Sequence, residues 1–344
     1  MRWLGLVSFL LLSGTAYAAE GDALAKIATD QGADRQAMLE AGARAEGALT
    51  IYTVGAQIDP LMAAFSAHYP WLATRVLKGA GPELVKRVTE EYKAGVHTVD
   101  AYEMDDYGIR LLQEGGVLAP FRSPEMQAYG PESIGPKDSW VMMRRDLISL
   151  GFNTKSVSPE AAPHTNKDLL DAKWKGKLGI SGSPTAIVTW VGALALSEGE
   201  PFLRKLGQQD LRIYNLGGRA VANLVVSGEA PLVVNARRSH MFASRKEGAA
   251  VEWRALGPSY ASVSGVALAG QPPHPHAAML FIDFQLGMEA QKIYSGDLGY
   301  SSMRKDLPGS DAKVEALYLT LRPNFYREYE AWTDLSDEVF GARK

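Results

Sequence analysis

Hydrophobic and polar positions along this chain follow two periods, one typical of strands and one typical of helices. Short runs of β-branched and apolar residues are each followed by a loop and then by apolar residues at helical spacing. In the first part of the chain, the predicted strands are residues 49–52, 73–77 and 96–102. Strand, helix, strand, helix, strand is the pattern of a parallel sheet with covering helices.

The same pattern recurs further along the chain. Its predicted strands there are residues 147–152, 177–181, 211–215 and 232–235. One helix is expected after 177–181, with Ser183 at the N-cap and Pro184 as its first residue. Two such sheets predict an α/β chain of two lobes, with ligand-binding loops at the carboxyl ends of the strands and a cleft between the lobes.

The N-terminus predicts export. Arg2 gives a positive start, residues 4–12 are apolar, and Ala16-Tyr17-Ala18 forms a small-residue cleavage site. Because the apolar run is too short to span a bilayer, residues 1–18 are expected to be a signal peptide that is cleaved before Ala19. Its removal takes away one arginine and no acid, so the formal net charge of −3 becomes −4.

Composition narrows the chemistry. A mild negative charge argues against a nucleic acid or an anionic membrane as partner. The chain has no cysteine, which excludes disulfides, thiolate metal sites and a cysteine nucleophile. The six histidines are not spaced like the ligands of a common metal motif, so no metal and no cofactor is predicted.

Basic residues stand where two strands lead into helices. Arg237 and Arg238 directly follow the predicted strand 232–235, and guanidinium groups form bidentate bonds with phosphate or carboxylate oxygens. Arg219 opens a helix after a Gly-Gly turn, where a cation is unfavourable unless an anion is bound. In a simpler interpretation, which stays open, Arg237 and Arg238 are solvated or pair with acids such as Glu229 or Glu247.

The loop around Ser183 and Thr185 also suits an anion, because the start of the following helix presents free backbone N–H groups. An N-cap role alone would account for Ser183 equally well.

Several segments carry a family resemblance through their order and spacing. They are LTIYT, KGAGPELVKRVTEEYKAGVHTVDAY, KWKGKLGISGSPTA, SGEAPLVVNARRSHMFASRKEGAAVEW and LGYSSMR, between about residues 45 and 305. Together they resemble the periplasmic solute-binding proteins of ABC importers, above all the branch that binds ferric ion, phosphorylated sugars and phosphonates. The resemblance implies a type II periplasmic binding fold with a hinged interlobe cleft. It implies a first lobe of residues 19–147 plus about 255–318, and a second of about 148–254 plus about 319–344.

The resemblance implies a monomeric periplasmic protein that delivers a solute to an inner-membrane ABC permease. The arginines and the helix starts, and not the family, indicate that this solute is a small anion, such as an organophosphate, phosphonate or carboxylate. The candidate ligand-binding residues are Gly55, Gln57, Gly81, Asp105, Ser183, Thr185, Arg219, Arg237 and Arg238. In the first lobe, Gly55 and Gln57 occupy the loop where ferric members often have a histidine. Asp105 follows the third strand, where an acidic ligand is expected; a turn at Gly81 and a helix cap at Asp105 are the simpler interpretations.

Ferric iron is the alternative ligand. In ferric members, two adjacent tyrosines follow the strand that here reads PLVVN, whereas this chain has Arg237 and Arg238. Because the two arginines are adjacent, we expect them to point different ways, with Arg238, which stands where a family tyrosine would, as the ligand contact. A hard trivalent cation prefers anionic oxygen ligands, and guanidinium groups repel it. Iron would therefore need a synergistic anion together with Asp105 and a phenol such as that of Tyr52 or Tyr102.

An exported hydrolase is the third interpretation. The chain has no Gly-x-Ser-x-Gly elbow and no paired-histidine metal motif. In the SGSPT turn, Pro184 removes the backbone N–H that an oxyanion hole would use. We therefore expect a binding protein and not an enzyme.

Overall fold

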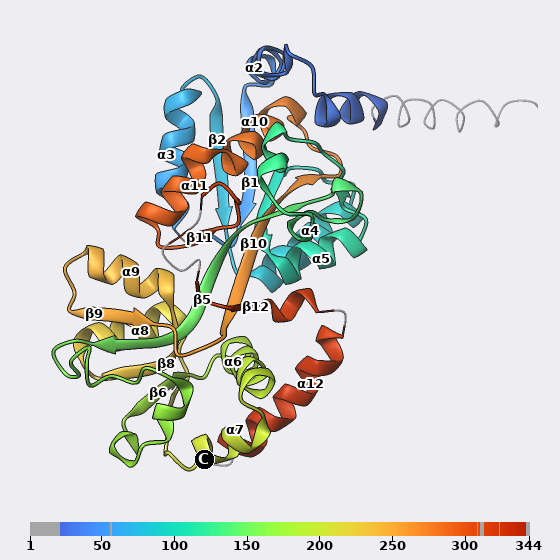
Figure 1. Cartoon of the computed structure of the whole chain (residues 1–344). Coiled ribbons are helices and arrows are strands. Elements are labelled where there is room, and N and C mark those ends of the chain that lie inside the picture. The colour runs from blue at the N-terminus through green and yellow to red at the C-terminus, as the bar shows by residue number, and fades with distance from the viewer. Residues whose placement is uncertain (1–20, 56, 308, 310–312, 323, 342–344) are drawn as a thin grey trace, which may run out of the picture. The chain divides into compact units, whose positions relative to one another are not determined.

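The computed structural model describes residues 21–55, 57–307, 309, 313–322 and 324–341 (Figure 1). The expected signal peptide, residues 1–18, lies outside this range. Among the described residues, no helix is long and apolar enough to cross a membrane.

Contacts divide the chain into two compact units. Unit 1 contains the residues up to Met143, Ser264–Gln291 and Arg304–Asp306; unit 2 contains Arg144–Val263, Lys292–Met303 and the residues from Leu307 onward. Strands β5 (Val141–Asn153) and β10 (Ser259–Ala269) each begin in one unit and end in the other. This division rests on contacts alone, so the lobe boundaries expected from the sequence stay a prediction.

Unit 1 is built on a sheet in the order β2-β1-β3-β10. Its strands are β1 (Ala48–Thr53), β2 (Ala73–Lys78), β3 (Ala101–Asp105), part of β10, and the short β4 (Leu118–Ala119). β1 pairs in parallel with β2 and β3, as predicted, whereas β10 is antiparallel to β3. Its helices are α2 (Arg35–Glu46), α3 (Asp59–His68), α4 (Gly81–Lys93), α5 (Asp106–Glu114), α10 (Pro275–Leu286) and α11 (Met288–Lys292), which ends just past the unit boundary. Short 3-10 turns are η1 (Pro124–Ala128), η2 (Pro131–Ser133) and η3 (Pro136–Asp138).

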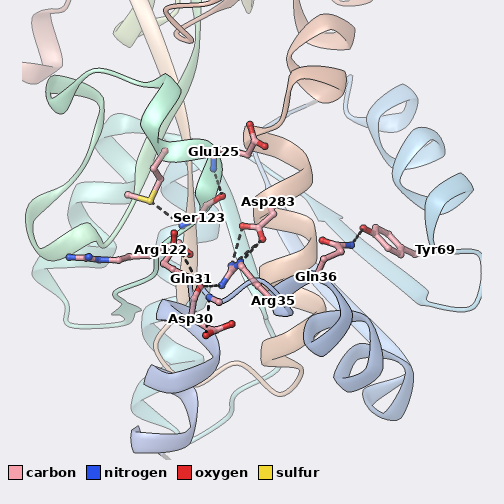
Figure 2. A network of polar contacts seen from close by, with 11 residues as sticks. Asp30, Gln31, Arg35, Gln36, Tyr69, Arg122, Ser123, Glu125 and Asp283 are labelled. Atoms are coloured by element: carbon pink, nitrogen blue, oxygen red, sulfur yellow. Dashed lines mark hydrogen bonds and ion pairs between the residues drawn. The ribbon is translucent and has the colours of Figure 1, made fainter.

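The helix α2 is attached to α10 at both ends, and Figure 2 shows the contact near its start. Near its start, the buried Arg35 donates through Nε to Asp283 at 3.1 Å. At its end, Glu46 accepts bonds from the backbone N–H groups of His276 and Ala277, in the first turn of α10. A carboxylate at a helix N-terminus is stabilising, so Glu46 fixes α2 through the start of its neighbour.

Unit 2 has a sheet in the order β5-β8-β6-β7. Its strands are part of β5, β6 (Leu178–Ser181), β7 (Arg212–Tyr214), β8 (Leu232–Arg237), β9 (Val251–Arg254), part of β10, β11 (Ser301–Ser302) and β12 (Ala316–Leu317). β6 is parallel to both β7 and β8, and β5 is antiparallel to β8.

Helices cover this sheet. They are α6 (Pro184–Ser197), α7 (Glu200–Gly207), α8 (Gly218–Ser227), α9 (Arg238–Lys246) and α12 (Phe325–Ser336). Shorter turns are η4 (Asn166–Leu170), η5 (Ala172–Trp174), η6 (Ile293–Asp297), η7 (Leu319–Leu321) and η8 (Asp337–Gly341). The core between α6, α12 and the sheet includes Phe152, Val191 and Trp332. Packing there removes most of the apolar surface of these side chains from water.

Candidate functional site

Three loops of unit 2 meet at one edge of its sheet, because β6, β7 and β8 run in parallel and end there. Side chains tie the loops together. The amide of Asn235 accepts from Ser181 N at 2.8 Å and donates to Ser181 O at 3.0 Å, joining β8 to β6. The Ser181 hydroxyl donates to Leu216 O at 2.8 Å, in the loop after β7. The starts of α6, α8 and α9 are thereby held at this edge.

The first turns of these helices read PTAI, GRAV and RSHM, and none contains an acidic residue. No carboxylate in these first turns therefore neutralises the positive dipole ends of the helices or accepts from their free N–H groups. Such an edge is suited to an anion.

Arg237 lies at this edge, at the N-cap of α9. Its Nη1 is 3.4 Å from Oδ2 of Asp146 on β5, and 35% of its side chain is exposed, against 4% for Asp146. Asp146 also accepts from Ser239 N at 3.0 Å and from Ser239 Oγ at 2.7 Å. The partner of Arg237 is thus a buried acid that the sequence did not indicate, and not Glu229 or Glu247.

Arg219 comes to the same place from α8. A Cβ at the neighbouring Gly218 would lie 3.4 Å from Cδ of Arg237 and 3.2 Å from Cε1 of His240, so all three residues are packed closely. Arg219 itself is 3.7 Å from Glu247 through Nη2, and its Nη1 donates to His240 O at 3.5 Å. Arg219 therefore has an exposed acid and a backbone carbonyl beside it, and its role as a ligand-binding residue stays a prediction.

His240 was not predicted as a site residue. Burial lowers the pKa of its imidazole to about 4; Asp146 opposes this shift, while Arg237 and Arg219 add to it. The imidazole is therefore neutral at pH 7. Arg219, Arg237 and His240 are called the basic cluster below.

Arg238 belongs to a different place in unit 2. Its Nη1 donates to Gly299 O at 2.5 Å, and its guanidinium lies 5.9 Å from the ring centroid of Phe242. It lines a groove of about 500 Å³ together with Phe242, Arg245 and Trp253. The adjacent arginines thus have different surroundings, and Arg238, the expected ligand contact of the two, is bonded to the carbonyl of Gly299.

Ser183 and Thr185 stand where the sequence placed them, at the start of α6. Ser183 has the extended backbone of an N-cap residue, yet within the described chain its side chain accepts no capping hydrogen bond. Thr185 is exposed. An N-cap bond therefore does not account for the hydroxyl of Ser183.

In unit 1, the candidate residues lie at the carboxyl ends of β1, β2 and β3. A Cβ at Gly81 would be 3.0 Å from Oδ2 of Asp105, so the structure brings these two together. Oδ1 of Asp105 accepts from Gly108 N at 2.8 Å, which confirms a helix-capping role for Asp105. Gly55 lies instead beside Glu103, whose Oε1 would be 3.1 Å from an added Cβ.

Two further features of this region were missed by the sequence reasoning. Glu103 is fully buried and accepts from Thr53 Oγ1 at 3.0 Å. The buried side chain of Asp106 has its pKa raised to about 8, first by burial and then by the charge of Asp105.

The remaining candidate of unit 1 is Gln57. Its side chain has a buried Oε1 with no hydrogen-bond partner among the described residues.

The two phenols considered for iron have other surroundings. The Tyr52 hydroxyl donates to the carboxylate of Glu91 at 3.0 Å. Tyr102 is buried, and burial raises its pKa, which disfavours a phenolate. Among the described residues, no group of three or more His, Cys, Asp or Glu side chains is arranged to hold a metal ion.

Comparisons with solved structures show the fold. Iron-bound HitA from Pseudomonas aeruginosa is 21% identical, with a TM-score of 0.69, and the match covers 85% of this chain and 99% of that one. AfuA from Actinobacillus pleuropneumoniae with bound fructose-6-phosphate is 18% identical, with a TM-score of 0.67 and coverages of 85% and 99%. The substrate-binding protein of an ABC transporter from Agrobacterium tumefaciens is 14% identical, with a TM-score of 0.69 and coverages of 84% and 94%. The predicted α/β type II periplasmic binding fold is confirmed.

A search of curated protein sequences finds no significant match. The family model for bacterial extracellular solute-binding proteins matches residues 103–319, more than half of the chain and the part that carries the basic cluster. Proteins of this family bind solutes and are not enzymes, in agreement with the sequence prediction. The chain belongs to the bacterial extracellular solute-binding proteins.

Proposed function

We propose that this protein is the periplasmic substrate-binding component of an ABC importer, and that it binds a small anionic solute through the basic cluster of unit 2. The likeness to the Agrobacterium protein supports the transport role, with an inner-membrane permease as partner. AfuA with its sugar phosphate supports an organophosphate as the ligand class.

One observation carries the choice of an anion. Arg219 and Arg237 converge on the start of α8, where the helix dipole is also positive. Asp146 offsets one of the two guanidinium charges and is occupied by Ser239 as well. A phosphate or carboxylate at this place would receive charge-assisted bonds from side chains and backbone together.

The test is calorimetric titration of the mature protein with inorganic phosphate, sulfate, hexose phosphates, alkylphosphonates and citrate. We expect binding of at least one of them, weakened about tenfold to a hundredfold in Arg237→Gln, because a charge-assisted hydrogen bond contributes about 1.5–3 kcal/mol. Arg212→Gln is the matched control, since Arg212 is an exposed arginine at the opposite end of β7. Indifference to the whole panel would overturn the proposal.

Ferric iron is a second candidate, favoured by the likeness to iron-bound HitA. It would use Asp105 in unit 1 and a synergistic anion. Addition of ferric citrate then produces a visible charge-transfer band if a phenolate takes part. Iron binding that is lost in Asp105→Asn and kept in Arg237→Gln would favour this function over an organic anion.

A further inference from the structure

His240 stands at a point of unit 2 where several charges meet. It is the third residue of α9, and its ring packs against Gly218, the first residue of α8. The two helices are neighbours in the fold (Figure 1). His240 Nδ1 is buried and forms no hydrogen bond with any described residue. An imidazole nitrogen in this state has lost its water without gaining a protein partner, which is costly.

Each element packed around the imidazole contributes a charge. β5 supplies Asp146, the end of β8 supplies Arg237, and α8 supplies Arg219 together with its positive dipole end. Glu247, at the end of α9, is 3.7 Å from Arg219 and is largely exposed.

The buried acid near the imidazole, Asp146, already accepts hydrogen bonds from other groups. Asp146 accepts from Ser239 N, from Ser239 Oγ and from Arg237. Arg237, Arg219 and a helix N-terminus therefore act on the imidazole together; the buried carboxylate of Asp146 is paired with Arg237, and the exposed carboxylate of Glu247 lies near Arg219. Burial first, and then the charges of Arg237 and Arg219, lower the pKa of the imidazole and so keep the ring uncharged.

We propose that His240 takes up a proton when an anion binds to the basic cluster, so that solute affinity rises as the pH falls. The inference rests on the proposed function, because it requires an anion at the start of α8. Such an anion offsets the charges of Arg219 and Arg237, which oppose an imidazolium in addition to burial. The imidazolium then has two N–H donors and adds a third cation to the site.

Thermodynamic linkage between proton binding and anion binding fixes the direction in which the affinity changes with pH. A group whose pKa is higher in the complex than in the free protein strengthens binding below the pKa of the complex and has no effect above it. Its contribution levels off near the pKa of about 4 in the free protein. Between those limits, the affinity changes by at most about tenfold per pH unit for a single proton.

Sulfate is the probe, because it stays a dianion throughout the range in which histidine titrates. We would titrate the mature protein with sulfate from about pH 8 to about pH 5. Buffers of different ionisation enthalpy measure the protons taken up on binding. The expected result is proton uptake and an affinity about tenfold higher at the acid end.

His240→Gln keeps a hydrogen-bonding side chain but cannot titrate, so it should bind sulfate with no dependence on pH. His164→Gln replaces an exposed histidine of the same unit and should keep the wild-type dependence. A second readout needs no variant. The proton NMR signal of the His240 ring should stay unshifted down to about pH 5 without sulfate, and should titrate at about pH 6 when sulfate is saturating.

The outcomes separate the two proposals. Sulfate binding of equal strength at every pH, with no proton uptake, overturns the role of His240 and leaves the proposed function standing. Wild-type pH dependence in His240→Gln overturns it in the same way. Failure of sulfate to bind at any pH also overturns this inference, whereas the proposed function fails only when the whole anion panel fails.

Discussion

Arg237 and Asp146 form an ion pair, with 3.4 Å between Nη1 and Oδ2. The side chain of Asp146 is buried, whereas 35% of the Arg237 side chain is exposed. The two residues are 91 positions apart in the sequence. The carboxylate also accepts from the backbone and the hydroxyl of Ser239, in the first turn of α9. Asp146 therefore both orients a guanidinium of the basic cluster and fixes the start of a helix.

Asp146→Asn keeps the shape of this residue and removes its charge. We expect the free energy of unfolding to fall by about 1–3 kcal/mol, because a buried donor of Ser239 loses its acceptor. Urea denaturation measures the change. Asp297→Asn is the control, because Asp297 forms an exposed pair with Lys246 that contributes about 0–1 kcal/mol. Equal losses in the two variants would contradict the structural role of Asp146.

The structure also separates Arg237 from Arg238 by function. Since Arg238 is bonded to the carbonyl of Gly299 and lies by Phe242, Arg238→Gln should leave anion affinity within about twofold of wild type. Arg237→Gln should weaken it strongly. Calorimetry with the tightest anion of the panel distinguishes them. A large loss in Arg238→Gln would return Arg238 to the ligand-binding residues, as the sequence suggested.

The alternation of strands and helices could be predicted from the sequence, because parallel strands with covering helices impose a repeating pattern on neighbouring residues. The loops at Ser183, Arg219 and Arg237 could be placed for the same reason, since each directly follows a strand of the pattern. Periodicity within a segment does not show which distant residue a side chain meets. Asp146 and His240 were missed for that reason.

Buried polar pairs were also beyond the sequence reasoning. Arg35 and Asp283 lie on helices from opposite ends of the chain, and only 5% and 17% of their side chains are exposed (Figure 2). Arg35→Ala should lower the free energy of unfolding by about 3–5 kcal/mol, because it leaves the acid buried without its partner. Arg122→Ala, which removes an exposed pair with Asp138, should cost about 0–1 kcal/mol in the same denaturation experiment. Similar costs would show that α2 is not held by the Arg35–Asp283 pair.

Asp106 predicts a dependence of stability on pH. Its pKa is about 8 in the folded protein, against about 3.9 in an unfolded chain. Between these values the folded protein holds a proton that the unfolded chain has released, so Asp106 lowers stability as the pH rises from about 4 to about 8. Asp106→Asn removes this loss and should raise the melting temperature by several degrees near pH 8, with little change near pH 4.

Melting curves across this pH range test the assignment. Asp59→Asn, at an exposed acid of the same unit, should keep the wild-type dependence. Parallel curves for wild type and Asp106→Asn would show that Asp106 is ionised in the folded protein.

Gly192 predicts a steric limit in the core of unit 2. It lies on α6, and an added Cβ would be 2.5 Å from Cδ2 of Trp332, a buried residue of α12. Gly192→Ala should therefore lower the free energy of unfolding by about 1–3 kcal/mol, although alanine is the better helix former. Gly296→Ala is the matched control, because an added Cβ there meets no atom within 4 Å.

A double mutant identifies the clash as the cause. In a Trp332→Leu background, where the indole ring is absent, Gly192→Ala should cost less than in the wild-type background. Chemical denaturation of the four proteins gives the coupling energy. Two outcomes would contradict this assignment: losses of unfolding free energy that simply add, or a Gly192→Ala variant as stable as Gly296→Ala. Either would mean that α12 moves away from α6 without a loss of stability, so that the packing of Trp332 on Gly192 does not limit this core.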